Sequence, residues 1–217
     1  MLVKTFSAAV FGIEAVPVTI EVDVTRGVRY MLVGLPDAAV KESQQRIESA
    51  MRAVGLHWPG RQVIINMAPA DIRKEGSSYD LPLAVGILAA SEMVSAGRLT
   101  GMLLTGELSL DGAVKPVRGV LPMALQARAS GFRGMMVPAE NAAEAAVVNG
   151  IDVYGVTSLD EVLGYMQGEV DLQPLNVDIN SLFSIQGNRY DSDFADVRGQ
   201  ENVKRALEVA VAGAHNA

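Results

Sequence analysis

The strongest constraint on the fold is a regular alternation of helical and strand-like segments in the second half of the chain. Helical patterns at residues 121–129, 140–148 and 159–166 alternate with short apolar runs at 134–137 and 152–156. Neighbouring parallel strands need a crossover connection, usually a helix. This order therefore predicts an α/β layer with a parallel or mixed sheet.

The first half of the chain begins with strands. Residues 16–24 alternate β-branched apolar residues with polar ones, the period-two pattern of a half-buried strand. Residues 62–68 form a short apolar run bounded by Pro69, which predicts an interior strand. Between them, a helical pattern opens at Asp37 and ends at Gly55. The whole chain is thus predicted to be mixed α/β (α+β).

A polar loop at residues 71–78 precedes an apolar segment that predicts a buried helix from Leu81 to about Val94. Asp80 is the expected N-cap, and Pro82 is tolerated in the first turn because its missing N–H would have no partner there. Further on, Asp111-Gly112 between two strand-like runs predicts a β-hairpin with a two-residue turn.

The chain divides into a main domain at residues 1–168, a linker at 169–192 and a final segment at 193–217. The linker is assigned because periodicity disappears there and polar residues dominate. A helix of about 13 residues is marginal alone in water. The final helix therefore needs a partner surface, either on the main domain or, as we favour, in the remainder of a further domain. Its apolar stripe consists of Val203, Ala206, Leu207, Ala210 and Val211.

Composition excludes several classes of protein. The chain has no cysteine, which rules out disulfides and thiolate metal sites and is typical of a cytoplasmic protein. No apolar run approaches the roughly 20 residues that span a bilayer, so no membrane contact is expected.

His57 and His215 lie far apart without ligand spacing, so no metal site is expected. Neither the phosphate loop G-x-x-x-x-G-K-[ST] nor G-x-G-x-x-G is present, so this segment should bind no cofactor.

The distribution of charge points to one candidate region for nucleic acid. The net charge is −7, which opposes nonspecific binding to phosphates. Residues 26–75 carry eight basic and five acidic side chains, a balance of +3, and the other positions carry −10. Arg73 and Lys74 are the first candidates for DNA contact, followed by Arg61 and Arg46. Ordinary solvated helix faces are the alternative for each.

Ser77 and Ser78 lie in a glycine-containing loop just before the apolar helix, where a nucleophilic serine could be held. A serine needs a nearby base, and the sequence does not show whether Lys74 or Lys115 reaches it. The alternative is that these hydroxyls satisfy free amides at the turn.

Three motifs taken together resemble the proteolytic domain of Lon protease and the C-terminal domain of the recombination protein RadA. They are KEGSS at 74–78, TGELSLDG at 105–112, and GFR at 131–133 followed by VPAEN at 137–141. The resemblance covers residues 1–168 and implies the Lon protease domain-like fold, a ribosomal protein small-subunit-five domain-two-like fold.

A closer resemblance is to the ComM/YifB family of magnesium-chelatase-like AAA+ ATPases. It rests on the opening segment VKTFSAAVFGIEAVPVTIEVDV and on VGLPDAAVKES at 33–43. DFADVRGQ at 193–200 resembles the entry to that family's ATPase module. The resemblance implies that Val197, Gly199 and Gln200 border the adenine pocket in the full-length protein, which would use ATP and Mg²⁺ and form a hexameric ring. This segment would then stop before the phosphate loop.

The Lon resemblance also implies that the catalytic pair is broken. Ser78 falls on the position of the Lon serine, whereas Leu121 stands where the catalytic lysine should be. Leucine can neither accept a proton nor carry charge, so we expect no catalytic residue and no peptidase activity.

The resemblance implies a non-catalytic N-terminal domain of an ATP-dependent DNA motor, a helicase or branch-migration enzyme of recombination and natural transformation. The domain's own part would be assembly or guidance of single-stranded or branched DNA. The alternatives are a motor subunit similar to magnesium chelatase in tetrapyrrole synthesis and a Lon-like serine peptidase, which Leu121 disfavours.

Overall fold

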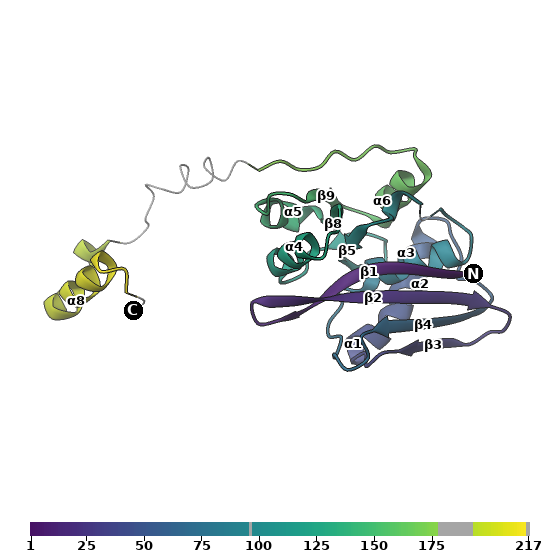
Figure 1. Cartoon of the computed structure of the whole chain (residues 1–217), viewed down its shortest axis with the longest axis horizontal. Helices are drawn as coiled ribbons and strands as arrows, with labels where there is room; N and C mark the ends of the chain where they lie inside the picture. Colours follow the sequence, from purple (N-terminus) through teal and green to yellow (C-terminus); the bar gives the residue numbers. More distant parts are fainter. Residues whose placement is uncertain (96, 178–192, 216–217) are drawn as a thin grey trace. The chain divides into compact units, whose positions relative to one another are not determined.

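The structure is a computed structural model that describes residues 1–95, 97–177 and 193–215 (Figure 1). The chain divides into two units, Met1–Val177 and Asp178–Ala217, which are described one at a time. Within the described residues, no helix is both long and apolar enough to cross a membrane.

The first unit opens with a four-stranded sheet in the order β1-β2-β4-β3. Its strands are β1 (Leu2–Phe11), β2 (Glu14–Thr25), β3 (Tyr30–Val33) and β4 (Gln62–Ala68). β2 is antiparallel to both β1 and β4, and β3 runs parallel to β4. Burial alternates along β2 and β4, as a sheet with one face on the core requires. The strands predicted at 16–24 and 62–68 are therefore confirmed, the second as an interior strand.

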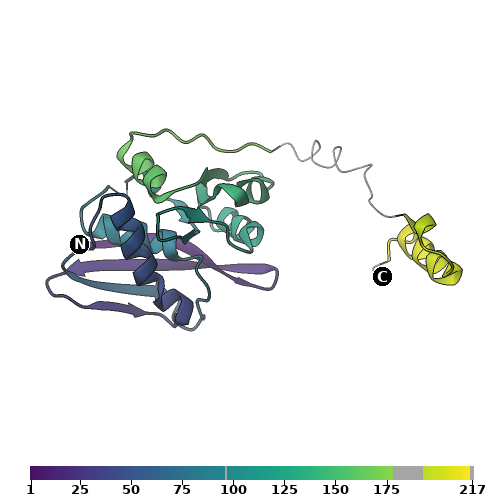
Figure 2. The same ribbon diagram turned by 180° about the vertical axis from the view of Figure 1, so that it is seen from behind.

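The helical stretch predicted from Asp37 to Gly55 is present as two helices, α1 (Ala38–Lys41) and α2 (Ser43–Ala53). The Asp37 carboxylate caps α1 by accepting a hydrogen bond from the amide of Val40 at 2.8 Å. The interruption lies at Glu42, where the amide of Gln45 bonds the Glu42 carbonyl three residues back at 3.2 Å. Seen from behind (Figure 2), α2 lies across the strands of the first sheet.

Helix α3 (Asp80–Ala90) forms the centre of the core, and every one of its residues is buried, as predicted. It packs closely on β2, since a Cβ at Gly86 would lie 2.7 Å from a methyl group of Val22. Two details of the prediction are wrong. Tyr79, not Asp80, is the N-cap, and the helix ends at Ala90 because Glu92 adopts a left-handed backbone conformation with φ of 64°.

A second, three-stranded sheet has the order β5-β8-β9, and all of its strands are parallel. Its strands are β5 (Met102–Leu104), β8 (Gly134–Pro138) and β9 (Asp152–Val156). Helix α4 (Val120–Ala129) lies between β5 and β8 in the chain, α5 (Ala139–Ala146) connects β8 to β9, α6 (Leu159–Gln167) follows β9, and a short helix η1 (Gly97–Leu99) precedes β5. Leu103, Met135 and Val137 pack with α4 and α5 in a second core. The alternation read from the sequence is therefore confirmed as a parallel sheet with crossover helices.

The predicted hairpin is present as β6 (Glu107–Leu108) and β7 (Val114–Lys115), but its turn is longer than two residues. The amide of Ser109 donates to the carbonyl of Ala113 at 3.0 Å, which leaves residues 110–112 in the loop. Gly112 adopts a left-handed conformation with φ of 86°. A three-residue hairpin loop commonly ends in such a residue, so the Asp-Gly signal located the hairpin and misjudged its turn.

The predicted linker falls partly outside the described residues, because 178–192 are not among them. Its first part, 169–177, has no helix or strand. It is nevertheless attached to the first unit, because Leu172 packs on the core and the amide of Leu175 donates to the carbonyl of Val153 at 2.8 Å. In the second unit, a short helix η2 (Phe194–Asp196) precedes α8 (Glu201–Ala212), which is the predicted final helix.

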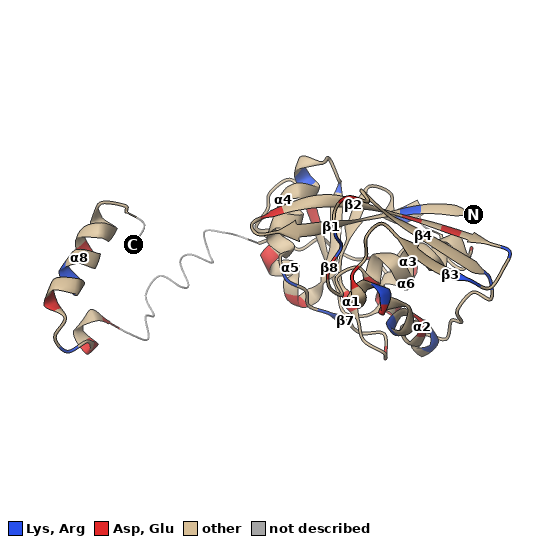
Figure 3. Ribbon diagram, turned by 90° about the horizontal axis from the view of Figure 1, so that it is seen from below, with Lys and Arg blue, Asp and Glu red and all other residues tan. Residues whose placement is uncertain are grey.

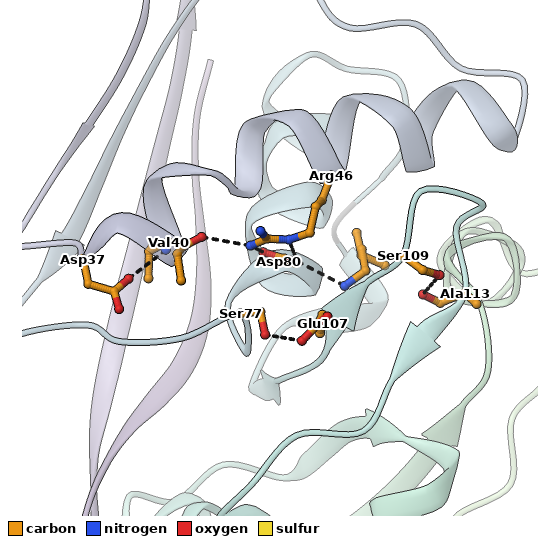
Figure 4. A network of polar contacts seen from close by, with 10 residues as sticks. Asp37, Val40, Arg46, Ser77, Asp80, Glu107, Ser109 and Ala113 are labelled. Atoms are coloured by element: carbon orange, nitrogen blue, oxygen red, sulfur yellow. Dashed lines mark hydrogen bonds and ion pairs between the residues drawn. The ribbon is translucent and has the colours of Figure 1, made fainter.

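An ion pair between α2 and α3 joins these two helices to each other and to the β6–β7 hairpin (Figure 4). Arg46 Nε lies 2.6 Å from Asp80 Oδ2, and Arg46 Nη2 lies 2.8 Å from Oδ1. The same guanidinium donates to the Ala39 carbonyl, and Asp80 also accepts from the amide of Leu108 at 3.2 Å. The Asp80 side chain is only 1% exposed. Burial raises the pKa of Asp80 despite these contacts, and the pair with Asp80 raises the pKa of Arg46.

Arg46→Met should lower the free energy of unfolding by about 3–5 kcal/mol at neutral pH, because it leaves the Asp80 carboxylate buried without its partner. The folded-state pKa of Asp80 is already above the unfolded value and should rise further. The native state then takes up the proton first, so the loss should shrink as pH falls through that pKa. Urea unfolding at neutral and mildly acidic pH measures both effects.

Arg52→Met on the same helix is the matched control, since Arg52 pairs with Glu48 at the surface and its side chain is 67% exposed. It should change stability by no more than about 0.5 kcal/mol. If Arg46→Met proves unfolded at neutral pH, Arg46→Met with Asp80→Asn should recover folding. A loss that grows on acidification would contradict the argument.

Candidate functional site

The candidate site is a pair of adjoining cavities around Ser78 in the first unit, each of about 320 Å³. We call the pair the Ser78 cavity. Both parts share Glu75, Ser78 and Arg118 in their walls. The first part is completed by Gly76, Ser77, Glu107, Pro116 and Val117, and the second by residues 8–11, Arg73, Tyr79 and Met123.

The backbone of Ser78 is held by the segment that leads into the hairpin. Its carbonyl accepts hydrogen bonds from the amide of Gly106 at 3.0 Å and from the hydroxyl of Thr105 at 3.2 Å. The carbonyl of Gly106 in turn accepts from the amide of Leu81 at 3.0 Å. Ser78 is therefore fixed at the point where α3 begins, and TGELSLDG supplies the partners.

Ser77 and Glu107 both line the first part of the cavity, and their side chains point toward one another (Figure 4). The Ser77 hydroxyl donates to the Glu107 carboxylate. The amide of Gly76 donates to the Asp37 carboxylate at 3.2 Å, so the residue that caps α1 also anchors this loop. Among the described residues the Ser78 hydroxyl itself has no hydrogen-bond partner. Ser77, not Ser78, is the serine paired with an acid.

Lys74 does not reach the Ser78 cavity and is not a base for it. The side chain is 0% exposed, and its ammonium donates to the carbonyl of Gly34 at 2.9 Å and to that of Pro69. Burial lowers the pKa of Lys74. The expectation that Lys74 contacts DNA from a flexible polar loop is therefore wrong, because this lysine fastens the loop to the interior.

Leu121 lies in the first turn of α4, 37% exposed, with its amide donating to the Glu144 carboxylate at 2.9 Å. It is not among the residues that line the cavity. The cation that does line both parts is Arg118. A guanidinium stays protonated in proteins and cannot act as a general base, so Arg118 can hold an anion but cannot activate Ser78.

Tyr79 contributes a phenol to the wall of the second part. Burial raises the pKa of its phenol, and the charges of Asp37 and Glu75 act in the same direction. The phenol therefore remains protonated near neutrality and can donate a hydrogen bond but not remove a proton. Two glutamates and two arginines complete the charged groups of the wall, and among the described residues the Ser78 hydroxyl donates to neither carboxylate, while Glu107 accepts from Ser77 instead.

The four basic residues predicted to contact DNA do not come together. Arg46 is held by Asp80, so it is not free for a phosphate, and Lys74 is buried. Arg73 is exposed, pairs with Glu75 at 3.1 Å and lines the second part of the cavity. Arg61 is exposed and precedes β4, whereas Arg73 follows it. These last two lie at opposite ends of one strand.

The residues expected to border an adenine pocket lie in the turn before α8. Gly199 and Gln200 both adopt left-handed conformations, with φ of 72° and 61°, and the carbonyl of Val197 accepts from Lys204 at 3.2 Å. The chain contains no phosphate loop, so these residues do not by themselves fit a nucleoside triphosphate. No group of three metal-ligating side chains is placed to hold an ion within the described ranges.

Sequence reasoning missed Glu107 and Arg118 as parts of the site. Glu107 occurs in TGELSLDG, which was singled out for the resemblance to Lon, and Arg118 stands three residues before Leu121. A signal was thus present, but only the fold shows that these stretches face Ser78.

Comparisons with known proteins agree with this geometry. The family described as "Subunit ChlI of Mg-chelatase" matches residues 20–141, and the one described as "Magnesium chelatase, subunit ChlI" matches 193–217. The YifB protein of Salmonella typhimurium is 40% identical over 210 residues, which cover 96% of this chain and 40% of the relative. The competence protein ComM of Haemophilus influenzae is 38% identical over 218 residues, covering 99% of this chain and 42% of the relative.

Lon protease 2 of Bacillus subtilis is 30% identical over 143 residues, which cover 64% of this chain and 25% of the relative. This similarity and the mixed parallel and antiparallel sheets confirm the predicted Lon-like fold. The chain spans about two fifths of the length of its YifB and ComM relatives. With the family match over residues 20–141, these similarities show that the chain belongs to the ComM/YifB family of magnesium-chelatase-like AAA+ ATPases.

Proposed function

We propose that the Met1–Val177 unit is a non-catalytic accessory domain of an ATP-driven DNA motor. The observation that carries the non-catalytic part is the Ser78 cavity, whose described walls contain no lysine and in which the Ser78 hydroxyl donates to neither Glu75 nor Glu107. Lys74 is hydrogen-bonded to two carbonyls in the interior, and by the resemblance to Lon, Leu121 would stand where the catalytic lysine is. The unit's role is then to bind or to assemble.

The motor part of the proposal rests on family membership and on the relatives' names. One relative is a competence protein, which supports a role in natural transformation and recombination, as a helicase or branch-migration enzyme. The full-length protein would use ATP and Mg²⁺ through an ATPase module that begins near residue 193 and would assemble as a hexameric ring. Its substrate would be single-stranded or branched DNA. It would therefore act in the cytoplasm.

A second candidate is a motor subunit of magnesium insertion in tetrapyrrole synthesis, favoured by the printed description of the matching family. Nothing in the Ser78 cavity favours a tetrapyrrole or a metal over other ligands. Magnesium insertion into protoporphyrin by a full-length relative would reverse the ranking. A Lon-like serine peptidase is the third candidate, and it requires a lysine beside the serine, which the described walls of the cavity do not contain.

A fluorophosphonate probe should not label Ser78, because an alcohol without a base is a weak nucleophile at neutral pH. Intact-mass spectrometry of the wild type beside Ser78→Ala and Ser77→Ala, with an active serine hydrolase as positive control, measures this. Labelling that disappears only in Ser78→Ala would refute the non-catalytic assignment, and labelling lost in Ser77→Ala would point to the Ser77–Glu107 pair.

The 217-residue chain should bind forked or single-stranded oligonucleotides at low salt, with affinity falling as salt rises because phosphate contacts release counterions. Fluorescence anisotropy across a salt series tests this. If no oligonucleotide binds even at low salt, the DNA part of the proposal fails and only assembly remains, which sedimentation of the full-length protein can examine.

A further inference from the structure

One end of the first sheet brings together basic residues that are far apart in the sequence. Thr25, the last residue of β2, pairs with Gln62, and Tyr30, the first residue of β3, pairs with Val63. The loop at 26–29 therefore starts and finishes beside the first residues of β4, directly after Arg61. The carbonyl of Arg29 accepts from the amide of Val63 at 2.8 Å, which fixes this arrangement.

Close packing holds this loop against β4. Gly27 has a φ of 137°, and a Cβ there would lie 2.9 Å from the side-chain oxygen of Gln62, so only glycine lets the loop pass so near. On the other side, Tyr30 and Trp58 meet edge to face with ring centroids 5.6 Å apart. This contact ties the segment before Arg61 to the first residue of β3.

Arg26, Arg29 and Arg61 are all exposed at this end, and we call them the arginine cluster. In the described part of the chain, none of the three pairs with a carboxylate. The nearby acid, Asp23, lies 3.9 Å from the N-terminal ammonium. Figure 3 shows basic residues in the loop that joins β2 to β3. The cluster concentrates a charge of +3 on a chain whose net charge is −7.

We propose that the arginine cluster is a contact surface for the sugar-phosphate backbone of DNA. It lies at the end of β4 opposite the Ser78 cavity, and the proposal rests on the DNA role given above. The ends of β2, β4 and β3 span about 10 Å, two spacings of about 4.8 Å. Duplex DNA carries one charge per about 1.7 Å of axis, so several phosphates lie within that span.

The chemistry of the cluster favours phosphate over other partners. A guanidinium presents a planar fork of donors that matches two oxygens of one phosphate. Val28, 90% exposed between Arg26 and Arg29, offers an apolar contact to a sugar or an unstacked base. Such contacts position a nucleic acid without reading its sequence, as guidance through a motor requires.

The test compares three variants of the 217-residue chain by anisotropy with a forked oligonucleotide and a single strand. Arg26→Ala/Arg29→Ala/Arg61→Ala should bind at least about tenfold more weakly at low salt. For the single strand, three lost phosphate contacts should flatten the slope of log affinity against log salt by about 2. The matched control, Lys41→Ala/Arg52→Ala/Arg128→Ala, removes the same charge from exposed positions elsewhere in the unit and should bind within about threefold of the wild type.

Replacing the three arginines by lysines keeps the charge and should keep binding within about threefold, and equal thermal midpoints establish that each variant is folded. If the wild type binds and the alanine variant binds equally well, or the control loses as much, the cluster is not the contact although the DNA role stands. If the wild type binds no DNA, the assignment of the arginine cluster and the DNA role of the unit both fail. Equally tight binding to phosphatidylglycerol vesicles, with no competition by DNA, would assign the cluster to lipid and overturn the proposal.

Discussion

The buried pair of Arg46 and Asp80 is the interaction on which the first unit depends. It joins α2 to the start of α3, and Asp80 also holds the amide of Leu108 at the hairpin. Three segments distant in sequence thus meet at one carboxylate. Because the carboxylate is almost fully buried, removing any partner leaves charge or polarity unsatisfied in the interior, which is costly. The Ser78 loop lies directly before Asp80, so the geometry of the cavity follows from this pair.

Periodicity was sufficient to predict most of the elements. The strand at 62–68, the parallel layer in the second half and the burial of α3 all follow from local patterns of apolar residues. One error falls where a tertiary contact overrides a local preference, and another where the turn is longer than its two-residue signal. Asp80 has the side chain of an N-cap, yet Arg46 and Leu108 draw its carboxylate away, and Tyr79 takes the cap position. The hairpin turn differs because Gly112 occupies the left-handed position at the end of a longer loop.

The site was harder to predict, because sequence patterns do not show which way a charged side chain points. Arg46 and Lys74 look like exposed cations in a basic segment, and both are committed to interior partners. Arg118 stands three residues before Leu121 and lines the cavity in its place. Arg61 could be identified as a candidate, but its neighbours Arg26 and Arg29 become visible only with the register of β2, β3 and β4. The register of strand pairing shows which side chains lie close together, and composition does not.

The hydroxyl of Ser78, which has no hydrogen-bond partner within the described ranges, has a practical consequence. Cysteine differs from serine by one atom, and this chain has no cysteine of its own. Ser78→Cys would create the sole thiol of the chain, facing a cavity roomy enough for a small maleimide or nitroxide. A spectroscopic label placed there would lie at the opposite end of β4 from the arginine cluster and outside the hydrogen bonds that fasten the Ser78 loop. DNA binding by the labelled protein would then show whether the arginine cluster acts independently of the filled cavity.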